Sequence, residues 1–78
     1  MNLQQIFYAL EVYRTGNFTL AADNLFISQP SLSQQIKLLE KELQVTLFNR
    51  STRRKIELTS AGKTFIEHAL EIEKNLIL

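Results

Sequence analysis

Residues 26–43, FISQPSLSQQIKLLEKEL, begin with small polar side chains and continue with a regular apolar pattern. Four apolar residues recur at separations of four, three and four, the repeat of one α-helical face: Leu32, Ile36, Leu39 and Leu43. Ser28 can cap the first amides of this helix, and Pro30 is tolerated there because first-turn amides have no helical partner. We therefore predict a helix over residues 29–42, held to a core along one side.

The remaining elements are predicted from changes in the period of the apolar residues. In chain order we expect a helix at 3–14, about two helical turns within 18–26, the helix at 29–42, β-prone runs at 45–48 and 56–58, and a last helix capped by Thr59. This is the order of a winged helix-turn-helix, whose second motif helix enters the major groove of DNA. The predicted fold is mostly α, with three helices and a short β-hairpin wing in 1–58, and a long dimerising linker helix from 59 to 78.

The outward face of the helix at 29–42 carries side chains suited to a DNA groove. At about 100° per residue, the side opposite the apolar stripe bears Pro30, Gln34, Lys37 and Lys41, with Ser31 and Ser33 at its flanks. Amides can pair with adenine edges, lysine can reach guanine or phosphate, and small hydroxyls permit close approach. We expect no bulky apolar residue on this face. The alternative is that the serines merely cap the helix and the other polar residues merely solvate its surface.

Positive charge is concentrated in the middle of the chain. The net charge is only +1, yet residues 28–55 contain six basic and two acidic side chains. Four of the nine Lys and Arg residues lie within 50–55, in the expected hairpin tip at 49–55. Taken alone, such a run would be a solvated loop. Because arginine is favoured in narrow minor grooves and in forked phosphate contacts, its place after a helix-turn-helix pattern predicts contact with DNA.

The last helix has a heptad-like seam that a domain this small has little surface to cover. Apolar residues follow Gly62 at separations of three and four, and we assign them to homodimerisation: Phe65, Ala69, Ile72 and Leu76. Phe65 is also expected in the domain core. A two-fold dimer would pair two reading helices across a palindrome. The rival function is a protein-interaction module, in which the seam is the whole function and the basic tip contacts an acidic partner.

The residue types argue against an enzyme. The sequence has no cysteine and a single histidine, His68, which gives no disulfide, no thiolate metal site and no catalytic cluster. We expect no cofactor in these residues. No basic segment precedes an apolar run at the N-terminus, and no stretch approaches the ~18 apolar residues of a membrane span. The expectation is a cytoplasmic protein, and because the pattern of the last helix is still running at residue 78, a piece of a longer one.

The stretch from GNFTLAADNLF to IELTSAG resembles the DNA-binding domain of the LysR-type transcriptional regulators of bacteria. Its most specific pieces are AA at 21–22, SQPSLSQQI at 28–36, LE at 39–40, LF.R at 47–50 and LT.AG at 58–62. The resemblance implies a winged helix-turn-helix, a linker helix that pairs two subunits, and an absent C-terminal domain that binds a small-molecule effector. Full-length members of the family are commonly tetramers.

The resemblance also implies which residues contact double-stranded DNA. Base reading falls on Gln29, Pro30, Ser31, Ser33, Gln34 and Lys37. The minor-groove contact falls on Arg53, with Arg50 and Arg54 near the backbone. Many members carry Arg at the position of Gln34, so we expect an amide contact to adenine or a water-mediated contact there, rather than a contact to guanine.

Overall fold

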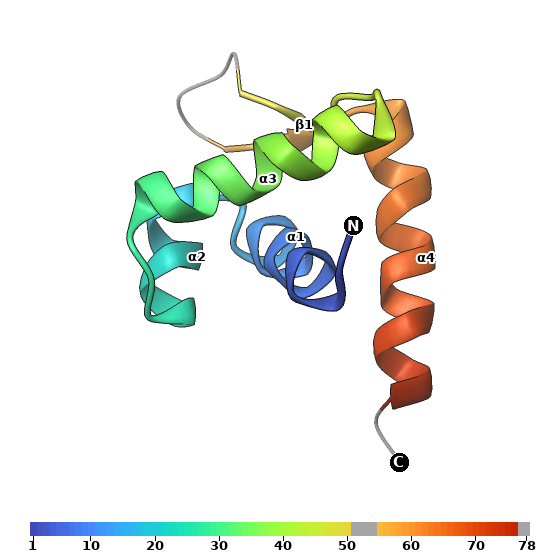
Figure 1. Ribbon diagram of the computed structural model, residues 1–78, viewed down its shortest axis with the longest axis horizontal. Coiled ribbons are helices and arrows are strands. Elements are labelled where there is room, and N and C mark those ends of the chain that lie inside the picture. Colours follow the sequence, from blue (N-terminus) through green and yellow to red (C-terminus); the bar gives the residue numbers. More distant parts are fainter. Residues whose placement is uncertain (51–54, 77–78) are drawn as a thin grey trace.

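The computed structural model describes residues 1–50 and 55–76, which form four helices and one short hairpin. The helices are α1 (Leu3–Thr15), α2 (Phe18–Leu25), α3 (Gln29–Leu43) and α4 (Ser60–Leu76), and the antiparallel strands are β1 (Phe48–Asn49) and β2 (Glu57–Leu58). Figure 1 shows α1 between α2 and α4, with α3 crossing over it and the hairpin beside α3. The predicted mostly α, winged helix-turn-helix architecture is confirmed.

Helices α1 and α3 begin where polar side chains cap their first backbone amides. The Asn2 side chain accepts the Gln5 N–H at 2.8 Å, and the Gln5 side chain accepts the Asn2 N–H at 3.3 Å. At the start of α3, Ser28 Oγ accepts the Ser31 N–H at 3.1 Å, with Pro30 in the first turn. These bonds satisfy amides that have no partner inside their helix, so local sequence defines where each helix begins.

The core lies where α1, α2 and α3 meet. From α3 it takes the completely buried Leu32, Ile36 and Leu39, and from α2 it takes Ala21 and Ala22. The two alanines leave little side chain between the helices, which allows the helices to pack closely. A second, smaller cluster joins α1 to α4 through Ile6, Leu10, Ile66 and Ala69. One side of α3 is therefore committed to holding the domain together.

The hairpin ladder is shorter than the sequence predicts. A strand is expected at 45–48, but β1 begins at Phe48. The reason is the end of α3, where Gln44 adopts a left-handed conformation with φ of 59°. The Val45 N–H then donates to the Glu40 carbonyl at 3.1 Å, so these residues wrap around the helix end before any strand can start.

The first turn of α4 is fastened to the backbone that enters β1. Thr59 caps the helix as predicted, since its hydroxyl accepts the Gly62 N–H at 2.9 Å. The same hydroxyl lies in hydrogen-bond contact with the carbonyls of Thr46 and Leu47. A Cβ atom on Gly62 would lie 2.0 Å from the Leu47 carbonyl oxygen. Only glycine permits so close an approach, which explains a glycine in the first turn of this helix.

Candidate nucleic-acid interface

The face of α3 opposite the core forms a groove of about 480 Å³. Its walls are Gln29, Pro30, Ser33, Gln34, Lys37, Leu38 and Lys41. All the residues predicted to read bases line this groove except Ser31, whose hydroxyl oxygen accepts from the Ser28 hydroxyl at 2.8 Å. The surface combines amides, a hydroxyl and two ammonium groups, which are the donors and acceptors that base edges require.

Leu38 corrects the expectation that this face has no bulky apolar side chain. It is 47% exposed and lines the groove one turn beyond Gln34. Its position follows from helix geometry, because it precedes the buried Leu39 by one residue and so points about 100° away from it. The groove therefore offers an apolar contact as well as polar ones.

A hydrogen bond between side chains helps to orient α3 on α1. The buried Gln5 donates from Nε2 to Oε1 of Gln35 at 3.1 Å. Gln35 is therefore turned toward α1, while its neighbour Gln34 is exposed in the groove. Two adjacent glutamines thus serve different surfaces, one joining the helices and one available to a partner.

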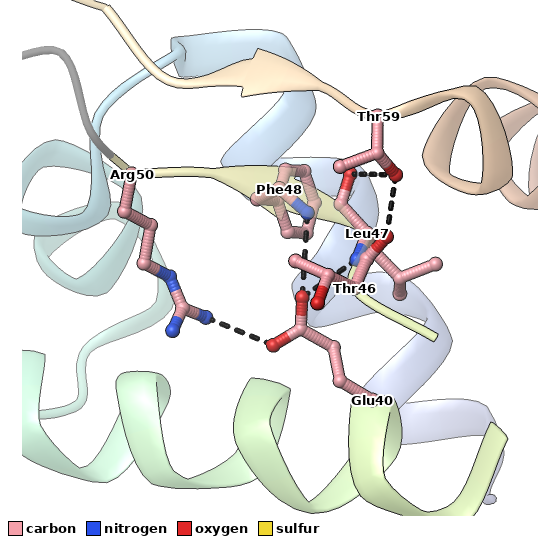
Figure 2. A network of polar contacts seen from close by, with 6 residues as sticks. All are labelled: Glu40, Thr46, Leu47, Phe48, Arg50 and Thr59. Atoms are coloured by element: carbon pink, nitrogen blue, oxygen red, sulfur yellow. Dashed lines mark hydrogen bonds and ion pairs between the residues drawn. The ribbon is translucent and has the colours of Figure 1, made fainter. Parts of the chain in front are cut away.

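The base of the hairpin is joined to α3 by the carboxylate of Glu40. In Figure 2, Glu40 extends from α3 toward the backbone of β1, and Arg50 reaches back toward it from the end of that strand. Oε2 of Glu40 accepts the Leu47 N–H at 2.7 Å and the Phe48 N–H at 3.3 Å. Oε1 accepts from Nη2 of Arg50 at 3.4 Å. One carboxylate therefore gathers three donors from the hairpin.

Arg50, predicted to lie near the DNA backbone, makes its described contacts inside the domain. Besides its bond to Glu40, its guanidinium carbon lies 4.7 Å from the centre of the Phe18 ring, the first residue of α2. Its side chain is 30% exposed. The other two arginines predicted for DNA, Arg53 and Arg54, lie outside the described residues.

The seam predicted for dimerisation is divided between two environments. Phe65 and Ala69 pack against the second core cluster, in contact with α1, and Ala69 is buried. Ile72 and Leu76 are 38% and 53% exposed. Beside them an apolar groove of about 220 Å³ is lined by Met1, Ile6, Leu43, Phe65, His68, Ala69 and Ile72. The single chain covers the first part of the seam and leaves the second part open.

An ion pair joins the end of α1 to the end of α4. Arg14 donates from Nη1 to Oε2 of Glu73 at 3.0 Å, and from Nη2 to Oε1. The hydrogen bonds from Arg14 lower the pKa of Glu73, and the same bonds raise the pKa of Arg14. Both groups therefore keep their charge over the whole neutral range, and the forked geometry adds direction to the contact.

The sequence match to a known family decides the class of this domain. Residues 3–63 match the family described as bacterial regulatory helix-turn-helix protein, lysR family. The chain belongs to the LysR family.

The LysR-family relatives of this chain are much longer proteins. The uncharacterized HTH-type transcriptional regulator YcgK of Bacillus subtilis (strain 168) is 51% identical over 72 residues, which cover 92% of this chain and 22% of YcgK. The HTH-type transcriptional regulator BudR of Klebsiella aerogenes is also 51% identical, over 92% of this chain and 50% of BudR. The chain thus spans about a fifth to a half of these relatives. Both are named transcriptional regulators, which are not enzymes.

A solved LysR-family domain has the same fold. The crystal structure of the BenM_DBD/benA site 1 DNA complex matches with a TM-score of 0.93 and 38% identity, over 97% of this chain and 84% of that one. That structure is a complex of the BenM DNA-binding domain with benA site 1 DNA. The winged helix-turn-helix described above is therefore that of a LysR-type DNA-binding domain.

In this LysR-family domain, sequence reasoning missed the roles of Leu38 and Glu40. Glu40 did carry a signal, because it belongs to the LE piece of the family pattern and is an acid within the basic third of the chain.

Across residues 1–50 and 55–76, no group of three or more His, Cys, Asp or Glu could hold a metal ion. Within the same residues, no helix combines the length and the apolar character needed to cross a membrane.

Proposed function

We propose that this domain binds double-stranded DNA at specific sequences as a homodimer and regulates transcription. In this proposal α3 enters the major groove and the wing at 49–55 lies at the flanking minor groove. The observation that carries it is the groove on α3, whose amides, hydroxyl and lysines lie opposite the completely buried Leu32, Ile36 and Leu39. The DNA complex of the BenM domain supports this mode over a protein-interaction module.

The residues proposed to contact DNA follow the groove and the wing. Bases are read by Gln29, Pro30, Ser31, Ser33, Gln34 and Lys37, with Arg53 in the minor groove and Arg50 and Arg54 near the backbone. Gln34 is exposed in the groove and can pair with adenine, directly or through water. Leu38 adds an apolar surface of the kind that packs on a thymine methyl.

The homodimer is proposed to form through α4. Its support is the exposed part of the seam, Ile72 and Leu76, beside an apolar groove in which Phe65 and Ala69 form one wall. A two-fold axis there would bring each exposed seam against the other and present two α3 helices to a palindromic site. We accordingly divide the chain into a winged helix-turn-helix at 1–58 and the start of a linker helix at 59–78.

For the whole protein, we propose a C-terminal domain that binds a small-molecule effector, tetramers built from two such dimers, and a cytoplasmic location. The support is the greater length of the relatives and their names as transcriptional regulators.

The proposed function is tested by titrating the protein with duplexes selected from random DNA, and with scrambled duplexes of the same composition, at two salt concentrations. We expect the selected duplex to bind more tightly at both concentrations. Affinity should fall with salt, with a slope of about −0.9 per phosphate contact. Failure to bind any duplex at low salt would favour the interaction module instead.

A further inference from the structure

Glu40 is an acidic side chain at a place where DNA binding alone would disfavour one. It lies on α3 between Lys37 and Lys41, and within ten residues of the wing that holds four basic residues. A DNA phosphate repels a nearby carboxylate, so the electrostatics of DNA binding gives no reason for an acidic residue here. Its side chain is only 12% exposed, which shows that it is turned inward and engaged.

The contacts of Glu40 add to the short ladder that the structure describes at the base of the wing. The ladder between β1 and β2 is two residues long on each strand, too short to hold a hairpin in place by itself. The Leu47 and Phe48 amides donate to the carboxylate at 2.7 and 3.3 Å. Hydrogen bonds to a charged acceptor are stronger than those between neutral groups. The direction in which the chain leaves α3 toward the wing therefore depends on this side chain.

Arg50 closes the same arrangement from the far side of β1. It is the last described residue before 51–54, and it joins Glu40 to the Phe18 ring at the start of α2. That ring meets the Phe48 ring edge-on, with 6.1 Å between their centres. The buried Nε of Arg50 has no hydrogen-bond partner in the part of the chain that the structure describes. Helix α3, strand β1 and helix α2 are thus joined at the root of the wing, and Figure 2 shows the contacts between α3 and β1.

We propose that Glu40 is a positioning residue for DNA recognition, which holds the root of the wing at a set place relative to α3 so that the minor groove is read in register with the major groove. This inference rests on the proposed function. It assigns Glu40 no contact with DNA. Its effect passes through the Leu47 and Phe48 amides and through Arg50.

Removing the charge of Glu40 should change the affinity for DNA in opposite directions, depending on whether the residue acts by positioning the wing or by electrostatic repulsion of the DNA. Glu40→Gln deletes a negative charge, which by itself would tighten binding to DNA. It also places an NH2 group, a donor only, among three donors, so the joint at the root of the wing is weakened. We expect about fivefold to tenfold weaker binding to the selected duplex, which corresponds to the net loss of one hydrogen bond of ordinary strength.

Two further variants serve as controls. Glu57→Gln removes the same charge from an exposed position on β2, and we expect unchanged or slightly tighter binding. Glu40→Asp keeps the charge but is one methylene shorter and cannot reach all three donors, so we expect it to bind more weakly, as Glu40→Gln does. Thermal unfolding of each variant confirms that it is folded at the temperature of the titration.

A modified duplex provides a readout that fold stability does not move. Replacing adenine with 2,6-diaminopurine in the flank adds an amino group to the minor groove and leaves the major-groove edge unaltered. We expect wild type to lose affinity for this duplex and Glu40→Gln to lose much less. The ratio of the two affinities is taken on one protein, so it does not depend on the folded fraction.

Each outcome decides the matter. Binding by Glu40→Gln as tight as wild type, with the same sensitivity to the modified flank, would overturn the role of Glu40 and leave the proposed function intact. Unfolding of both Glu40 variants at the titration temperature would assign Glu40 to the fold alone and also overturn it. If wild type itself does not distinguish the selected duplex from scrambled DNA, the proposed function fails, and the inference fails with it.

Discussion

Helices α3 and α4 are both amphipathic, but only α3 has its central apolar residues fully covered by its own domain. Its three central stripe residues are completely buried. In α4 the coverage stops partway, because Ile66 and Ala69 are buried while Ile72 and Leu76 are exposed. The stripe of α3 is thus buried except at Leu43, which is half-buried, whereas the seam of α4 is exposed at two of its residues.

The difference separates two kinds of available surface. In α3 the packing requirement is already met, so the residues on its outer side are not constrained by the core and can be chosen for a partner. In α4 the exposed residues of the seam, Ile72 and Leu76, are apolar, and burying them is itself favourable. One helix therefore presents a polar surface suited to recognition, and the other presents an apolar surface suited to self-association.

The largest expected effect tests the burial of the apolar stripe of α3 in the core. Ile36→Ala should lower the free energy of unfolding by about 2–5 kcal/mol, because it leaves a cavity beneath a fully buried side chain. Leu76→Ala is the matched substitution on the open part of α4 and should change it by less than about 0.5 kcal/mol in the monomer. Denaturant titrations at low protein concentration measure both. Equal losses would erase the contrast between the two helices.

The next effect tests whether the exposed part of the α4 seam mediates self-association. Leu76→Asp should weaken self-association by about 1.5–3 kcal/mol per subunit, because the apolar contact is lost and a charge enters the interface. Sedimentation equilibrium measures it. Leu20→Asp, at an exposed leucine of α2, is the control and should leave association unchanged. Similar weakening by both variants would move the interface away from α4.

The outer side of α3 is tested by Gln34→Ala. We expect a loss of about 1–3 kcal/mol on the selected duplex and little loss on scrambled DNA, because one base contact is removed. Gln4→Ala, an exposed glutamine on α1, is the control and should bind both duplexes like wild type. An equal loss on the two duplexes would reduce Gln34 to a residue of the general surface.

The smallest effect concerns the ion pair that joins α4 to α1. Hydrogen bonds from Arg14 lower the pKa of Glu73 below its ordinary value of 4.5. A lowered pKa means that this contribution to stability is complete above about pH 4.5 and is lost as the pH falls through the pKa of the folded state. Wild type should exceed Glu73→Gln in stability at neutral pH and lose that advantage in acid. A difference that does not vary with pH would contradict the assignment.

Sequence reasoning predicted the helices well because their signals are local. A cap such as Ser28 with Ser31 joins residues three positions apart, and the spacing of an apolar stripe is visible within one helix. The polar side of α3 followed directly from that spacing. On that side Leu38 was missed, because a leucine beside the stripe can pack at its edge or turn outward, and only tertiary packing decides between the two.

The root of the wing could not be predicted, because its contacts join separate elements. No local pattern indicates which carboxylate of α3 turns inward. Nor does one indicate that Arg50, at the end of β1, lies over Phe18 of α2. The seam of α4 was predicted as a whole, but which of its residues the domain buries depends on how α1 packs against α4. Such boundaries are set by tertiary packing.

The attachment of α4 at Thr59 and Gly62 has a mechanical consequence. The first turn of this helix is fastened to the backbone that enters β1, so the start of α4 and the root of the wing are directly linked. With 17 residues, α4 is a lever about 25 Å long. In the proposed dimer, a few degrees of rotation between two such levers would be amplified into ångströms of separation between the two DNA-reading ends.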